Sequence, residues 1–462
     1  MRFFKYIKVA TIALGLAVTT LSSCGDELEL TPYQSVSPEE GIKNASDLQV
    51  LLVGAYEAMT SSNVYGARIL MNAELYGLSD DEIVWQGTFP DPRQFYNKFL
   101  LTTNSDVANM WIACYRVINI TNLIIENLGV INTENNPSAL ATKNRIEGEA
   151  RAIRAAMHFE LLRFYGKTFI EGAANNDADG GIPIVTKSGD ESKVKRNTVA
   201  EVYQFIEEEL VKAESLLPNA ATNGIYFDKA VAAAYLSRVY LQQYKWASAR
   251  DAANRVIASG KYSLVGDYSD AFNNAEKSTE DIFVMKSTEG DNINSMYTFF
   301  SVNSRNDIYY VGGILDMFEG GDTRLDMFDG DGNIYKWNEP LNGNVNVIRL
   351  AEMYLTRAEA NQVLGTSVGA TPLEDINTIR RRVGLPDLSS VTLEDIRKER
   401  KLELIAEGHA IHDLKRWKRS VVGIGSDGNP ITYQYNSPAL TAPIPQREIN
   451  VNPNLVQNEG YN

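Results

Sequence analysis

Apolar residues recur at helical spacing in four blocks, and this pattern constrains the fold more than any other feature of the sequence. The blocks lie at about 40–60, 105–166, 198–260 and 347–419. Apolar side chains three and four residues apart fall on one face of a helix, so each block predicts helices that bury one side. The sequence therefore predicts a mainly α protein with a scaffold of about four helix pairs.

The third block holds the clearest internal repeat unit. Counted from Ala230, it places small and large apolar residues where a tetratricopeptide repeat packs two antiparallel helices closely. The spacing favours a tetratricopeptide-like scaffold, and a generic helical hairpin is the alternative. The residues that carry this pattern are Leu236, Ser237, Tyr240, Ala249, Ala253 and Val256.

The fourth block is expected to end in one long helix over 392–419. A capping box at 392–395 predicts its start, and the cations at 415–419 suit the negative end of a helix dipole. Glutamates at 399, 403 and 407 repeat every four residues along it. We expect this ridge to pair with the arginines at 380–382, one helix earlier, in a structural network. A solvated ridge is the alternative.

Long stretches separate the helical blocks and are rich in Gly, Asn, Asp, Ser and aromatic residues. They cover 61–104, 171–197, 261–346 and 420–462. Segments of this length inside a compact protein usually carry function. We therefore expect a helical scaffold from which irregular insertions present a ligand-binding surface.

The N-terminus predicts export and anchoring. Three cations in the first eight residues precede an apolar run over 9–21, which is too short to span a bilayer and typical of a signal peptide. The run closes on Cys24 and resembles the lipobox of bacterial lipoproteins. We expect a signal peptide at 1–24, cleaved before a lipidated Cys24, and a single domain over 25–462. An ordinary signal peptide with a coincidental Cys is the alternative.

Charge and composition exclude several functions. The net charge of −15 falls to −18 once the three leader cations are removed, which argues against a nucleic-acid partner. Two Cys and three His leave little room for a zinc cluster, and Cys114 is expected to be a buried small hydrophobe. No nucleophile elbow, phosphate loop or metal signature occurs, so we expect neither an enzyme nor a cofactor.

The insertions supply candidates for a glycan site. A sugar offers flat C–H faces ringed by hydroxyls, which calls for aromatic platforms beside polar donors and acceptors. Trp85 and Trp337 are the first choices because their neighbours are polar, whereas Trp111, Trp246 and Trp417 follow helical patterns and are expected in the core. The full candidate set is Asp80, Asp81, Trp85, Phe89, Tyr96, Tyr297, Phe299, Arg305, Tyr309, Tyr310 and Trp337.

Two other patterns hint at cations. The segment 329–333 alternates Asp and Gly like the start of a calcium loop, but Ile334 stands where the loop needs Gly, so a tight acidic turn is favoured. His409 and His412 are three residues apart, as two ligands on one helical face would be. We expect a structural role for this pair, and no metal.

The order of motifs resembles the SusD/RagB family of outer-membrane nutrient-binding lipoproteins. The most specific matches lie in the C-terminal half, and the resemblance spans essentially the whole mature chain. The residues after the Glu-Gly-His motif depart from it, with His412 where an aromatic is common. The matching segments are 148–155, 159–166, 181–184, 349–360, 376–385, 399–404, 407–409, 413–417, 443–449 and 457–461.

The resemblance implies a monomer with four tetratricopeptide-like units on one side and a ligand-binding face on the other. Such a protein captures a glycan at the cell surface and passes it to a TonB-dependent transporter of the SusC type, opening above it like a lid. Peptide capture, as in relatives of the RagB type, is the alternative within the family. A helical-repeat scaffold that binds only another protein is the alternative outside it.

Overall fold

Helices form most of the protein in the computed structural model. The described residues are 41–189, 192–221, 225–288, 290, 294–425 and 427–461, and the expected lipidation site, Cys24, lies outside them. Residues 44–462 form one unit by their contacts. The helices are α3 (Ala45–Thr60), α4 (Arg68–Gly77), α5 (Pro90–Asn97), α6 (Ser105–Glu126), α7 (Pro137–Tyr165), α8 (Val199–Leu216), α9 (Lys229–Gln242), α10 (Trp246–Ala258), α11 (Ser295–Phe300), α12 (Gly312–Leu315), α13 (Leu350–Leu364), α14 (Pro372–Arg382), α15 (Leu393–Glu403), α16 (Ala410–Arg416) and α17 (Gln446–Val451).

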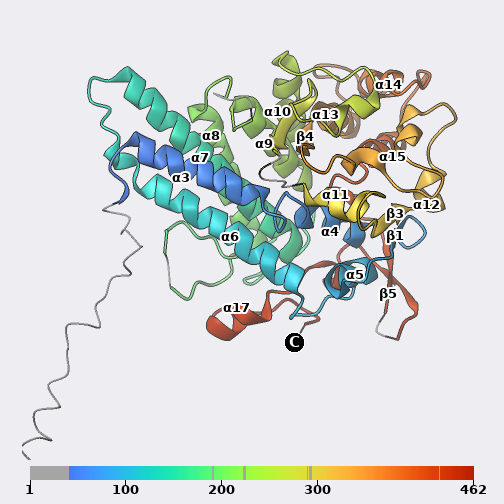
Figure 1. The fold of residues 1–462 in the computed structure, drawn as a ribbon, viewed down its shortest axis with the longest axis horizontal. Helices are drawn as coiled ribbons and strands as arrows, with labels where there is room; N and C mark the ends of the chain where they lie inside the picture. The colour runs from blue at the N-terminus through green and yellow to red at the C-terminus, as the bar shows by residue number, and fades with distance from the viewer. Residues whose placement is uncertain are drawn as a thin grey trace, which may run out of the picture. The chain divides into compact units, whose positions relative to one another are not determined.

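Most of the long helices pack as successive pairs. Helix α3 packs against α6, α7 against α8, α9 against α10, and α13 against α14. Neighbouring pairs touch through α6 and α7, α8 and α9, and α10 and α13. Figure 1 shows α3, α6 and α7 running side by side. This arrangement confirms the prediction of a mainly α scaffold built from helix pairs.

The α9–α10 pair shows what the small repeat residues do. Leu236 and Ser237 on α9, and Ala249 and Ala253 on α10, are all buried. Small side chains at a helix interface let two backbones approach closely. The Ser237 hydroxyl donates to the carbonyl of Ala234 at 2.8 Å, so its burial leaves no polar group unpaired.

Two expected core residues of α6 are confirmed. Trp111 and Cys114 are buried, and the Trp111 ring meets the Tyr165 ring edge-on at 5.0 Å between centroids. Burial raises the pKa of the Cys114 thiol, which therefore stays protonated. Trp246 and Trp417, also expected in the core, are only half-buried.

The segment 61–104 differs from the irregular insertion that was expected. It contains α4, in which every residue from Ile69 to Gly77 is buried. A Cβ added at Gly77 would lie 2.0 Å from the backbone nitrogen of Ile411, so α4 and α16 pack backbone to backbone. A helix buried on all sides has no polar face, which is why its period does not stand out in the sequence.

The prediction of a single helix over 392–419 is wrong. Its capping box at 392–395 is present, but α15 is followed by a turn at 404–409 before α16 begins. In that turn Ala406 has φ 64° and Gly408 has φ 81°. These left-handed conformations end the helix.

The carboxylate of Glu74 on α4 organises this turn. It accepts backbone N–H bonds from Ala406 at 3.2 Å, Gly408 at 2.9 Å and His409 at 3.0 Å. Burial raises the pKa of Glu74 to about 7, against the opposing effect of these N–H groups. The approach is tight, because a Cβ at Gly408 would lie 2.8 Å from the Cα of Leu70.

The glutamate ridge forms a buried network, as predicted, with partners that were expected only in part. Glu403 pairs with Arg382 at 2.6 Å. Glu407 instead pairs with Arg349 at 2.7 Å and with Lys336 at 2.6 Å. All five side chains are buried, and buried charges persist only when they are paired.

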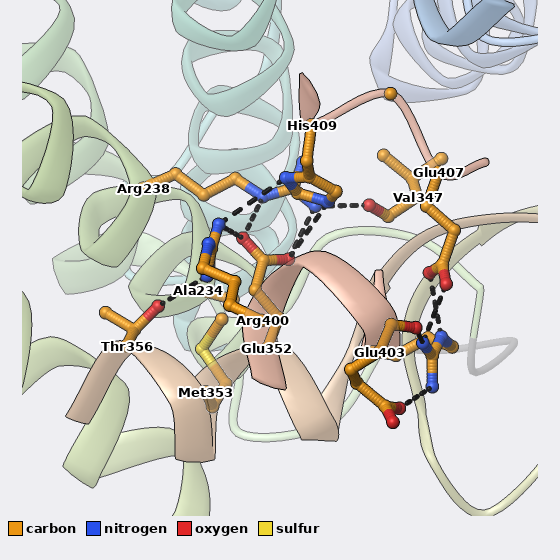
Figure 2. A network of polar contacts seen from close by, with 12 residues as sticks. Ala234, Arg238, Val347, Glu352, Met353, Thr356, Arg400, Glu403, Glu407 and His409 are labelled. Atoms are coloured by element: carbon orange, nitrogen blue, oxygen red, sulfur yellow. Dashed lines mark hydrogen bonds and ion pairs between the residues drawn. The ribbon is translucent and has the colours of Figure 1, made fainter. Parts of the chain in front are cut away.

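A second buried network joins α9, α13, α15 and the turn after α15, as Figure 2 shows. Glu352 accepts two hydrogen bonds from Arg238, at 2.8 and 2.6 Å. Arg400 and His409 approach the same carboxylate at 3.7 and 4.0 Å, and Arg400 also donates to Asp413 at 2.7 Å. His409 is therefore part of a polar network that ties helices together.

Three short antiparallel strand pairs link segments outside the helix pairs. The β1–β3 pair connects two insertions that are far apart in the sequence, 61–104 and 261–346. The strands are β1 (Ile83–Trp85) with β3 (Ile308–Tyr310), β2 (Asp281–Met285) with β4 (Val345–Arg349), and β5 (Val421–Ile424) with β6 (Pro430–Tyr433).

Candidate ligand-binding face

The β1–β3 ribbon brings the two aromatic insertions together. Val84 lies opposite Tyr309, and Trp85 lies opposite Ile308. Alternate residues of a strand point to opposite faces, so the residues flanking Val84 and Tyr309 are buried while these two are partly exposed. The ribbon therefore has one inward and one outward face.

Trp85 and Tyr310 fall on the inward face, which corrects their assignment as ligand platforms. Trp85 is 2% exposed and Tyr310 is 0% exposed. The Trp85 ring packs against Phe299, which is also buried, at 6.4 Å between centroids. A stacking platform needs an open ring face, whereas these three rings are buried beneath the outward face of the ribbon.

Trp337 is also a core residue, so its assignment as a sugar platform is wrong. It is 0% exposed, and its indole N–H donates to the carbonyl of Ala406 at 3.1 Å. The preceding residue, Lys336, donates to the carbonyls of Glu403 and Ile405 at 3.1 and 2.8 Å. The polar neighbour Lys336 is therefore itself buried against the turn at 404–409.

An exposed aromatic and a stacked arginine stand at one end of the ribbon. Phe89 is 41% exposed, and the Arg305 guanidinium carbon lies 4.1 Å from its ring centroid. Arg305 is oriented by Asp307 at 2.7 Å and reaches Thr88 at 3.3 Å. Beneath them, Phe299 meets Phe89 at 6.5 Å between centroids. Phe89 is thus a partly exposed ring that Arg305 and Phe299 contact.

A polar group lies beside the ribbon. Tyr96 is half-buried, and burial is the largest cause of its raised pKa, followed by the Asp80 carboxylate and the Tyr309 hydroxyl. Asp80 and Tyr309 therefore lie within electrostatic range of the Tyr96 hydroxyl. Under them, Lys98 is buried and donates to the carbonyls of Leu78 and Tyr96 at 2.5 and 2.7 Å.

The remaining two candidates lie nearby in other roles. The half-buried Tyr297 donates its hydroxyl to the carbonyl of Asn303 at 3.2 Å, which shapes the turn before Arg305. Asp81 has an exposed side chain, and its carbonyl accepts the N–H of Gly313 at 2.7 Å. We use "ligand-binding face" for the five outward residues Asp80, Phe89, Tyr96, Arg305 and Tyr309.

A cavity of about 250 Å³ lies next to this face and was missed from the sequence. Asp81 and Glu82 line one side of it, and Lys401, Trp417 and Arg419 line another. Lys401 forms an ion pair with Glu82. Trp417 was expected in the core because it follows a helical pattern, but α16 ends at Arg416 and leaves its ring half-buried at this cavity.

In the acidic turn at 329–333, the carboxylate of Asp329 is hydrogen-bonded by groups of the turn itself. Asp329 accepts the N–H groups of Asp331 and Asn333 at 3.0 and 2.9 Å, and the Asn333 side-chain amide at 2.8 Å. This is the tight turn that the sequence favoured. Among the described residues, no group of three or more His, Cys, Asp or Glu could hold a metal ion, and no helix is long and apolar enough to cross a membrane.

Two protein-family models match the chain. One, described as the SusD family, matches residues 323–461. The other, described as starch-binding and associating with the outer membrane, matches residues 27–241. Together they cover α3 to α8, nearly all of α9, and the C-terminal region that carries α13 to α16.

Individual relatives give the same picture. The SusD-like protein P38 of Formosa agariphila is 25% identical over the full length of both chains. The SusD-like protein P2 of the same organism is 30% identical over 55% of this chain, although the match spans only 46% of that relative. A solved structure from Bacteroides vulgatus ATCC 8482, assigned as a sugar binding protein, is 27% identical, covers 91% of this chain and 100% of its own, and superposes with a TM-score of 0.82.

Proposed function

Because the chain belongs to the SusD/RagB family, we propose that it binds a glycan at the outer membrane. The observation that carries this proposal is the ligand-binding face, where an exposed Phe89 ring with Arg305 stacked on it stands near a polar group. A sugar needs this combination of a flat apolar surface and adjacent donors and acceptors. The sugar-binding and starch-binding descriptions of similar proteins support the same ligand class.

We also propose how the protein is anchored and with what it works. The signal peptide is cleaved just before Cys24, Cys24 carries the lipid, and 25–462 forms one domain at the cell surface. The protein hands its glycan to a TonB-dependent transporter of the SusC type. The outer-membrane association in the matching family description supports this location. A Cys24→Ser variant is expected to move from the membrane fraction to the soluble fraction, and a variant that stays with the membrane contradicts the lipid anchor.

A glycan array tests the ligand class directly. The purified chain is applied to arrays of oligosaccharides and of peptides under the same conditions. We expect saturable binding to a related set of glycans and none to peptides. Binding to peptides alone would establish the RagB-like alternative, and binding to neither would favour a protein partner.

The same material separates binding from turnover. The chain is incubated with each bound oligosaccharide, and reducing ends are measured over hours. A binding protein leaves their concentration unchanged. Sustained release, proportional to protein concentration, would contradict the proposed function because it would show a glycoside hydrolase.

A further inference from the structure

A second, smaller cavity lies between α7, α8, the α9–α10 turn and α16, away from the ligand-binding face. Its volume is about 30 Å³. Cationic and neutral donors line it, and none of its described lining residues carries a carboxylate. Its polar lining residues are Arg163, Lys167, Thr168, Tyr203, Gln242, Tyr244, His412, Lys415 and Arg416.

Lys415 is the unusual member of this lining. It is 6% exposed. Within the described part of the chain its ammonium has neither a hydrogen bond nor an ion pair, unlike the buried Lys98 and Lys336, which donate to carbonyl oxygens. An isolated buried ammonium is costly, and burial alone lowers the pKa of Lys415 to about 7.

Three further polar atoms at this cavity also have no hydrogen-bond partner among the described residues. The His412 ring, which packs edge-on against Phe164, has an unbonded and buried Nε2, and the buried Arg163 Nε is unbonded as well. Tyr203 is a largely buried residue, and its hydroxyl forms no hydrogen bond to any described residue. Native proteins rarely leave several buried polar groups unsatisfied in one place, so their convergence here calls for an occupant.

The occupant must be negative, because the carboxylates around the cavity already have cations of their own. These carboxylates lie on α7, α8, the loop after α7 and α16, and Glu359 on α13 pairs with Arg416 as well, at 2.6 Å. The pairs are Glu160 with Arg163, Asp177 with Lys167 at 2.8 Å, Glu171 with Lys418 at 2.9 Å, Glu207 with Lys245, and Asp413 with Arg400 and Arg416 at 2.7 and 2.9 Å. Lys415 is left as the excess positive charge.

We propose that this cavity binds one halide-sized anion, held by the Lys415 ammonium with donors from Tyr203 and His412. The cavity volume limits the size of the bound ion. One water molecule needs about 10–15 Å³ of cavity volume, so about 30 Å³ suits a single chloride ion and is too small for a sugar acid or a nucleotide phosphate.

Anomalous diffraction tests the site without any substitution. Crystals of the protein are soaked in sodium bromide, and data are collected at the bromine edge. The proposal requires an anomalous peak within contact distance of Lys415 Nζ. Density for water alone, with no anomalous peak at this place, would overturn it.

Thermal unfolding tests the same ion in solution. The Tm is measured in sodium chloride and in sodium gluconate at equal ionic strength for the wild type, Lys415→Met and Lys212→Met. Lys212 is the control because it is an exposed lysine of α8 that does not line the cavity. We expect chloride to raise the Tm of the wild type and Lys212→Met, and this shift to be lost in Lys415→Met. An equal chloride shift in all three proteins would contradict the proposal.

Discussion

Buried polar side chains join distant parts of this chain at the scale of single residues. Glu74 is the clearest case, because one carboxylate on α4 receives three N–H bonds from the turn more than 300 residues later. Such a contact produces no periodic pattern in the sequence. A glutamate in an apolar run can be read from the sequence, but its partners cannot.

Removal of the Glu74 carboxylate should destabilise the folded protein. We expect Glu74→Ala to lower the free energy of unfolding by about 3 kcal/mol or more, because it leaves several buried N–H groups without an acceptor. Glu57→Ala is the control, since Glu57 is exposed, and should change stability by less than about 0.5 kcal/mol. Urea unfolding of both variants measures the difference, and similar losses would show that Glu74 does not organise the turn.

Lys415 should give stability a pH dependence in the absence of halide. Its folded-state pKa of about 7 lies below the usual value near 10.4, so between these values the unfolded chain binds more protons. Stability should therefore rise with pH from about 7 to 10, by at most about 1.4 kcal/mol per pH unit. Lys415→Met should lack this component, as measured by urea unfolding in gluconate. The same slope in both proteins would contradict it.

The candidate site shows how far single residues could be assigned from sequence. Phe89, Arg305 and Tyr309 lie in polar insertions and are exposed or partly exposed in the structure. Trp85 and Trp337 have similar surroundings in sequence but are buried. Trp85 points inward because side chains alternate along its strand, and Trp337 is held in the core by its hydrogen bond to Ala406. Neither constraint can be recognised in the sequence alone.

Close backbone packing determines the architecture at the scale of secondary-structure elements. Helices α4 and α16 touch through Gly77, and the turn before α16 touches α4 through Gly408. The sequence predicted the helix start at 392–395 correctly. It could not reveal the interruption at 404–409, since the helical spacing of the glutamates continues through it.

A pair of glycine substitutions separates backbone strain from packing. Gly408 and Gly428 have nearly equal φ, 81° and 80°, but only Gly408 has close neighbours. We expect Gly428→Ala to cost about 1 kcal/mol from φ alone. Gly408→Ala should cost about 1–3 kcal/mol more, because its Cβ meets Leu70. Chemical denaturation measures both, and equal costs would show that α4 yields to the added methyl group.

The whole molecule combines a helical scaffold with segments that meet only in three dimensions. The helix pairs could be predicted because each has an apolar face of regular period. The meeting of 61–104 with 261–346 through β1 and β3 could not, since three-residue strands carry too little pattern to be recognised. The ligand-binding face depends on that meeting, so its composition was foreseen and its geometry was not.

The central claim is that this face binds the glycan. Isothermal titration with a glycan found on the array should compare the wild type, Phe89→Ala/Tyr309→Ala, and Phe99→Ala. Phe99 is the control because it is 45% exposed and lies outside the face. Loss of two aromatic contacts of about 1 kcal/mol each predicts a Kd at least about tenfold higher for the double variant, with Phe99→Ala unchanged. An unchanged Kd in a folded double variant would contradict the account.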